Sequence, residues 1–234
     1  MNPVGRTSVS PGSSANRGDA LRAVIFDFDL TLVDSTRAVV ACVDHALESL
    51  GFEPVSPEEV RRTIGLSLEA TFEALTGESG SQAQARFRRL FVERADLVMV
   101  AQTELLKGVL PALDTLRERG LNLGIVSTKY RYRIEAILDR YGVRDRFLTI
   151  VGGEDTISHK LAPEGILLAL ATLGVHGREA VYVGDHVVDA EAAARAATPF
   201  VGVLTGTTRE EEFHRFPHLG ILPSMPQLPF FLAT

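Results

Sequence analysis

The stretch from residue 21 to residue 35 constrains the fold of this chain more than any other. It reads LRAVIFDFDLTLVDS, an apolar run followed by two carboxylates one residue apart, Asp27 and Asp29. A continuous apolar run with Val, Ile and Phe is typical of a strand buried on both faces of a parallel sheet. Ligands bind beyond the carboxyl ends of such strands, so the two acids lie where chemistry is expected. Two buried carboxylates this close require a cation, because both cannot stay ionised without one.

The composition is that of a globular protein without a membrane-spanning segment. The chain has 234 residues, of which 45% are hydrophobic, and no run approaches the ~20 apolar residues that span a bilayer. The formal net charge of −6 gives no attraction to nucleic acid or to an anionic membrane, so we expect neither as a partner. The single cysteine, Cys42, excludes an internal disulfide and suits the cytoplasm, which is the expected location.

The pattern of elements divides the chain into three parts. Residues 1–20 are rich in Ser, Gly, Pro and Asn, which predicts a disordered leader. Residues 35–104 show only helical patterns, including a capping box from Ser56 to Glu59, and predict an all-helical cap domain. The remaining residues, 21–34 and 105–234, alternate between helix and strand patterns and predict an α/β core domain.

The alternating patterns in the core predict a parallel sheet with right-handed crossovers, that is, a Rossmann-like, doubly wound α/β fold. After the first strand, further strands are expected at 121–126, 147–151, 181–183 and 200–203. Helices are expected at 37–50, 68–75, 81–98, 110–118, 133–141, 163–174 and 189–197.

Polar or glycine residues directly follow four of the expected strands. Because the carboxyl ends of parallel strands share one edge, these residues should converge on one rim. They are Asp27 and Asp29, Ser127 and Thr128, Gly152 and Gly153, and Asp185. Acids of this kind are hard oxygen ligands suited to Mg²⁺, and the lysine available nearby is Lys160.

In this order the residues resemble the signature of the haloacid-dehalogenase-like hydrolase superfamily. That signature is D-x-D-x-T, then Ser or Thr, then a downstream Lys, and then G-D-x-x-x-D. Here it reads DFDLT at 27–31, Ser127, Lys160 and GDHVVD at 184–189. The resemblance covers about residues 24–203, and the helical insertion is similar to the small cap of the phosphoglycolate-phosphatase-like branch.

The resemblance implies a role for each motif residue. Asp27 is expected to be the nucleophile that forms an aspartyl-phosphate, and Asp29 the general acid and base. Mg²⁺ would be held by the carboxylates of Asp27 and Asp185 and the backbone carbonyl of Asp29, with Asp189 orienting these ligands. The residues expected to bind the phosphate are Ser127, Thr128, Lys160 and Thr31, and those expected to set specificity in the cap are Gly65 and Ser67.

The chain departs from the family pattern at three positions. Lys160 is separated from Pro163 where Lys-Pro is common, so Lys129 is a rival for the cation. Leu30 stands where Gly is usual, and His186 replaces the usual Ser or Thr and is expected to be a loop residue near the site.

Ser127 and Thr128 have an alternative role. Their hydroxyls could cap the following helix instead of binding a phosphate.

The function expected from this resemblance is hydrolysis of a small phosphorylated metabolite by a magnesium-dependent phosphatase. Phosphoglycolate is the first candidate substrate, followed by pyrophosphate or a sugar phosphate. A sugar-phosphate phosphomutase would retain the same aspartyl chemistry, and a haloacid dehalogenase is disfavoured because its members lack the acid equivalent to Asp29. A non-catalytic regulatory binding protein with the same fold is the alternative from another class. We expect a monomer or a homodimer.

Overall fold

The computed structural model describes residues 20–156 and 161–233. Lys160 and nearly all of the predicted leader lie outside this part of the chain. The described residues contain a six-stranded sheet in the order β5-β4-β1-β6-β7-β8, in which every pair is parallel. Its strands are β1 (Ala23–Phe26), β4 (Asn122–Val126), β5 (Thr149–Val151), β6 (Ala180–Gly184), β7 (Phe200–Val203) and β8 (Gly220–Leu222).

The order of these strands confirms the doubly wound, Rossmann-like fold. From β1 the chain moves outward to β4 and β5, returns to β6 on the other side of β1, and then continues outward to β7 and β8. The direction of winding therefore reverses between β1 and β6. Sheets of this kind bind ligands at the carboxyl ends of the strands where this reversal occurs.

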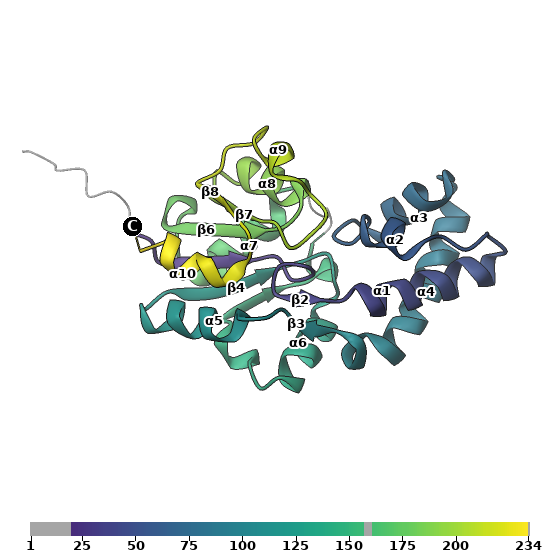
Figure 1. The fold of residues 1–234 in the computed structure, drawn as a ribbon, viewed down its shortest axis with the longest axis horizontal. Coiled ribbons are helices and arrows are strands. Elements are labelled where there is room, and N and C mark those ends of the chain that lie inside the picture. Colours follow the sequence, from purple (N-terminus) through teal and green to yellow (C-terminus); the bar gives the residue numbers. More distant parts are fainter. Residues whose placement is uncertain (1–19, 157–160, 234) are drawn as a thin grey trace, which may run out of the picture.

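Helices cover both faces of the sheet (Figure 1). Alternate residues of β1 point to opposite faces, so that Val24 and Phe26 join one hydrophobic cluster and Ala23 and Ile25 the other. The first face is covered by α5 (Val109–Glu118), α6 (Arg131–Arg140) and α10 (Leu228–Phe231), and the second by α7 (Glu164–Leu173), α8 (Val187–Arg195) and α9 (Glu210–Phe213). Short 3-10 helices are η1 (Arg144–Arg146), η2 (Gly153–Asp155), η3 (Gly177–Glu179) and η4 (Met225–Gln227).

The four helices between β1 and α5 form an insertion beside the sheet (Figure 1). They are α1 (Thr36–Leu50), α2 (Pro57–Arg61), α3 (Leu68–Thr76) and α4 (Ser81–Gln102). The rings of Phe72 and Phe87 pack within this insertion with their centroids 5.3 Å apart. The chain enters and leaves it through an antiparallel ribbon of β2 (Val33–Asp34) and β3 (Glu104–Leu105). The ribbon lies at the predicted cap boundaries, but strands of two residues are too short to show a sequence period.

Expected and observed elements differ at some of their ends and in several short elements that were not expected, namely β2, β3, β8, α9 and α10. The predicted capping box is confirmed, since the amide of Glu59 donates to Ser56 Oγ (3.2 Å) and the amide of Ser56 to Glu59 Oε2 (2.8 Å). Helix α4 continues to Gln102 instead of ending near residue 98, and β8 is an additional strand at the sheet edge. Among the described residues, no helix combines the length and apolar character needed to cross a membrane.

Candidate active site

Acidic side chains from two loops meet where the winding of the sheet reverses. Strands β1 and β6 pair in register, and the amide of Asp27 continues the ladder by donating to the Val183 carbonyl (2.8 Å). This register places Asp27 beside Asp185, and the first turn of α8 adds Asp189. One carboxylate oxygen of each acid lies within 4.8 Å of the others, and all three side chains are buried.

This acidic group fits a divalent metal ion. Three buried carboxylates at this separation repel one another unless a cation lies among them. Carboxylate oxygens are also the ligands that Mg²⁺ and other hard divalent ions prefer. The residues that would hold the ion are Asp27 and Asp185, with Asp189 against them.

Neighbouring donors orient two of these acids. The hydroxyl of Thr31 donates to Asp185 Oδ1 (2.9 Å), and both groups are buried. The oxygens of Asp189 accept from the Tyr182 hydroxyl (3.3 Å) and from the amide of His186 (3.0 Å). The observed partner of Thr31 is the carboxylate of Asp185. Phosphate binding by Thr31 and the orienting role of Asp189 stay predictions.

His186 begins helix α8 and does not join the acidic group found among the described residues. Its Nδ1 accepts from the amide of Val188 (3.2 Å), which satisfies one of the free amides of the first turn. The ring is therefore used as a helix cap beside the site. The sequence analysis expected a loop residue here, and the structure shows that His186 is the N-cap residue of α8.

Asp29 forms an ion pair with Lys129. Lys129 Nζ lies 3.2 Å from Asp29 Oδ2, and both side chains are less than a tenth exposed. The other carboxylate oxygen, Oδ1, is buried without a hydrogen-bond partner among the described residues. A buried acceptor without a partner is costly, so this oxygen is a strained feature of the site. Lys129, the rival of Lys160 in the sequence, is the cation that the described part of the chain supplies beside Asp29.

The loop after Asp29 reverses through a left-handed residue. Leu30 has a φ of 59°, a conformation that a residue with a branched side chain adopts at a cost and that glycine adopts freely. The carbonyl of Leu30 accepts from the hydroxyl of Thr205 (2.5 Å), a contact from the loop after β7 that holds this turn. The usual glycine is therefore replaced without loss of the turn.

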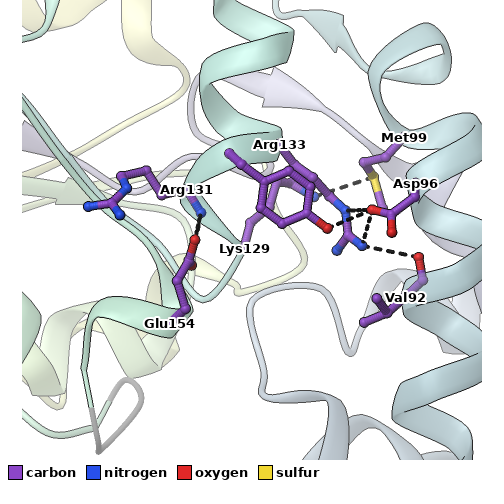
Figure 2. Close-up of polar contacts among 8 residues, drawn as sticks. Val92, Asp96, Met99, Lys129, Arg131, Arg133 and Glu154 are labelled. Carbon is purple, nitrogen blue, oxygen red and sulfur yellow. Dashed lines mark hydrogen bonds and ion pairs between the residues drawn. The ribbon is translucent and has the colours of Figure 1, made fainter.

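Ser127 and Thr128 follow β4 on the same edge of the sheet. Ser127 is buried, its amide donates to the Val151 carbonyl (3.0 Å), and its Oγ accepts from the amide of Lys129 (3.3 Å). The hydroxyl of Thr128 donates to the carbonyl of Gly65 in the helical insertion (3.4 Å). Neither hydroxyl caps the next helix, because the first amide of α6 donates to the carboxylate of Glu154 (Figure 2).

A cavity of about 370 Å³ lies between the sheet edge and the helical insertion. Asp29, Thr128 and Lys129 line it from one side, and Gly65 and Ser67 line it from the other. Gly65 has a φ of 99°, which favours glycine, and Ser67 Oγ accepts from the amide of Ala70 (3.2 Å) to cap α3. The two predicted cap residues therefore face the cavity, and their role in specificity stays a prediction.

A buried arginine joins α6 to the insertion beside this cavity. Arg133 donates to Asp96 Oδ1 through Nη2 (2.6 Å) and Nε (3.0 Å), and to the carbonyl of Val92 (3.1 Å) (Figure 2). Its guanidinium also lies about 5 Å from the rings of Tyr130 and Tyr132. Burial, followed by the hydrogen bond to Asp96, raises the pKa of Tyr132 to about 12. No motif in the sequence marks this contact.

Comparison with known proteins gives one consistent result. The family model described as haloacid dehalogenase-like hydrolase matches residues 24–203. The phosphoglycolate phosphatase of Yersinia pseudotuberculosis is 31% identical over 191 residues, which are 80% of this chain and 82% of that protein. The pyrophosphatase PpaX of Bacillus pumilus is 34% identical over 191 residues, 82% of this chain and 87% of that protein. A crystal structure of a haloacid dehalogenase-like hydrolase from Bacteroides fragilis is 40% identical, with a TM-score of 0.87 over 89% of this chain and 99% of that one.

Proposed function

We propose that this chain, which belongs to the haloacid dehalogenase-like hydrolase family and is a phosphatase, uses Mg²⁺ to hydrolyse phosphoglycolate through an aspartyl-phosphate on Asp27. One observation carries the proposal. The buried group of Asp27, Asp185 and Asp189 lies next to the Asp29–Lys129 pair, which faces the cavity. Phosphoglycolate is the first candidate because the Yersinia relative is named for that activity.

The chain's own residues can carry out both halves of the reaction. Asp27 attacks phosphorus in line, which forms an oxygen–phosphorus bond on Asp27 and breaks the bond to the ester oxygen. Asp29 gives a proton to the departing oxygen and then takes one from the water that opens the aspartyl-phosphate. When bound, a divalent ion neutralises charge on the phosphoryl oxygens. Ser127, a buried residue that directly follows β4, would donate to those oxygens.

Lys160 lies outside the described residues. Its proposed role is still the one predicted from the sequence, which is to offset the negative charge of the phosphate. We assign the cation next to the general acid to Lys129, because Lys129 forms an ion pair with Asp29. Thr128 and Thr31 stay secondary candidates for phosphate contact. The cap domain is proposed to span residues 35–104, from the end of β2 to the first residue of β3.

Pyrophosphate is the second candidate substrate. It is favoured by the Bacillus relative, which is named as a pyrophosphatase at a similar level of identity. A phosphomutase of the same fold would use the same two acids, and it is a weaker alternative because the relatives compared above are named as a phosphatase and a pyrophosphatase. A regulatory binding protein is weaker still, since Asp27 and Asp29 are both present. We propose a cytoplasmic enzyme, monomeric or homodimeric, that acts on a small metabolite and binds neither nucleic acid nor a membrane.

The test is phosphate release from phosphoglycolate, pyrophosphate, hexose phosphates and p-nitrophenyl phosphate, with and without Mg²⁺. Wild type is compared with Asp27→Asn and Asp29→Asn, and Asp34→Asn is the matched control because Asp34 is an exposed acid of the same segment. We expect Asp27→Asn to abolish turnover, Asp29→Asn to lower kcat by about 10²- to 10⁴-fold, and Asp34→Asn to stay active. No release from any ester by wild type with Mg²⁺ would refute the proposal.

A further inference from the structure

The ammonium group of Lys129 has hydrogen-bonding capacity that its surroundings do not use fully. Its side chain is 7% exposed, and one of its partners among the described residues is Asp29 Oδ2 (3.2 Å). The other is Met99 Sδ (3.4 Å), as Figure 2 shows. An ammonium has three donors, and a thioether sulfur is a weak acceptor. A buried cation with one good acceptor is therefore placed to bind another, and the cavity lies in front of it.

Other cations at the cavity are already engaged. Arg133 is held by Asp96 and by the carbonyl of Val92. Arg88 lies 3.6 Å from Glu69, and its side chain is 53% exposed. Within the described residues that line the cavity, Lys129 is thus the cation that combines burial with a position beside Asp29.

The ion pair also limits how far the second acceptor lies from the ester oxygen. The ester oxygen must come within hydrogen-bond reach of Asp29, whose Oδ2 is 3.2 Å from Lys129 Nζ. Since each hydrogen bond spans roughly 3 Å, an acceptor on Lys129 lies at most about 9 Å from that oxygen, and only a few ångströms from it when both hydrogen bonds point to the same side of the ion pair. A carboxylate on the carbon that bears the ester oxygen fits this second, compact arrangement, whereas an acid several bonds away does not.

The remaining wall of the cavity is largely apolar. Val39, Ile64, Phe91 and Met99 line it, and its volume of about 370 Å³ exceeds what a two-carbon acid fills. An apolar substituent on the ester-bearing carbon would therefore be accommodated. Such a substituent would leave the contacts to Asp29 and Lys129 in place.

We propose that Lys129 binds a carboxylate adjacent to the ester oxygen, so that the substrates are phosphate esters of 2-hydroxycarboxylic acids, including those with an apolar substituent on that carbon. This proposal rests on the proposed phosphatase function and specifies its substrate class. Lys129 would thus be a specificity residue that touches substrate. It would also hold Asp29 in place.

The first test compares kcat/KM of the wild-type enzyme with Mg²⁺ for 2-phosphoglycolate, 2-phospholactate, ethyl phosphate and p-nitrophenyl phosphate. We expect both carboxylate esters to exceed ethyl phosphate by about 10- to 100-fold, the effect of one charged hydrogen bond. Equal values for ethyl phosphate and the carboxylate esters would overturn this inference and leave the phosphatase function intact. No turnover of any ester, p-nitrophenyl phosphate included, would overturn the phosphatase function itself.

The second test uses Lys129→Met, with Arg88→Gln as a matched removal of charge at the same cavity. Lys129→Met should lower activity on every ester, because Asp29 loses its partner, but should lower kcat/KM for 2-phosphoglycolate about 10- to 100-fold more than for ethyl phosphate. Arg88→Gln should keep the wild-type ratio of kcat/KM for 2-phosphoglycolate to kcat/KM for ethyl phosphate. An unchanged ratio in Lys129→Met would mean that the lysine only positions Asp29, and would overturn the proposal. The first test needs no variant, so it remains decisive if Lys129→Met does not fold.

Discussion

The backbone of Gly206 packs directly against the carboxylate of Asp185. A Cβ built at residue 206 would lie 2.0 Å from Asp185 Oδ2, which is well below the 3.0 Å that real Cβ atoms keep from non-bonded atoms. The same loop, which follows β7, also reaches two other parts of the site. The hydroxyl of Thr205 donates to the Leu30 carbonyl, and Arg61 of α2 donates to the Thr205 carbonyl (2.9 Å). One loop therefore contacts Asp185, the turn after Asp29 and the helical insertion.

Replacing Gly206 by Ala should weaken metal binding. The new methyl group cannot fit without moving Asp185. We therefore expect the affinity for Mg²⁺ to fall at least about tenfold, which is the smallest loss typical when the groups that support metal ligands are disturbed. The measurement is the rise in melting temperature across a Mg²⁺ titration. Gly80→Ala is the control, because a Cβ at residue 80 meets nothing within 4 Å. Equal Mg²⁺ midpoints for Gly206→Ala and wild type would contradict the prediction.

The hydroxyl of Thr31 should matter for the metal site independently of any contact with phosphate. Thr31→Val keeps the shape of the fully buried side chain but removes the donor to Asp185 Oδ1. We expect Mg²⁺ affinity, measured by calorimetry without substrate, to fall by about 10- to 100-fold. Thr31→Ser, which keeps the hydroxyl, should bind Mg²⁺ nearly as wild type does. If Thr31→Val binds Mg²⁺ normally but has a raised KM, the hydroxyl serves the phosphate instead.

The contact between Asp96 and Arg133 should make stability depend on pH in acid. Burial raises the pKa of Asp96, but the hydrogen bonds from Tyr132 and Arg133 lower it more, so its pKa lies below the usual value. A carboxylate with a lowered pKa in the folded state stabilises the fold above its unfolded pKa of about 4 and loses that contribution as pH falls through the folded value. We therefore expect the unfolding free energy of wild type to fall below about pH 4, and that of Asp96→Asn to fall less steeply.

Denaturant unfolding at a series of pH values measures this difference. Asp139→Asn is the control, because Asp139 is an exposed acid on α6. Its curve should run parallel to that of wild type. Parallel curves for Asp96→Asn as well would show that the ion pair contributes nothing to acid stability.

The capping box at the start of α2 should contribute modestly to stability. Ser56→Ala removes the acceptor for the Glu59 amide, which should lower the unfolding free energy by about 1 kcal/mol. Chemical denaturation monitored by circular dichroism measures the loss. Ser56→Thr, which keeps a hydroxyl acceptor, should recover most of it.

The sequence alone was enough to predict the doubly wound core and the acids that meet at its edge. The continuous apolar run before Asp27 is a local signal of a buried strand. The helix patterns that alternate with the later strands are local too, because they depend on a period of 3.6 residues. Because parallel strands align their carboxyl ends, these local signals also predict that Asp27 and Asp185 converge, as the structure shows. The capping box at Ser56 was visible for the same reason, since its partners are three residues apart.

Only the tertiary structure decided which neighbours support those acids. The contacts of Lys129 with Met99, Thr31 with Asp185, Gly206 with Asp185 and Arg133 with Asp96 join residues that lie far apart in the chain, and no residue spacing encodes them. The short strands β2, β3 and β8 were missed because two or three residues cannot show a period. Local patterns specify the helices and strands and the sheet edge at which parallel strands have their carboxyl ends. The partners of a side chain depend on how these elements pack.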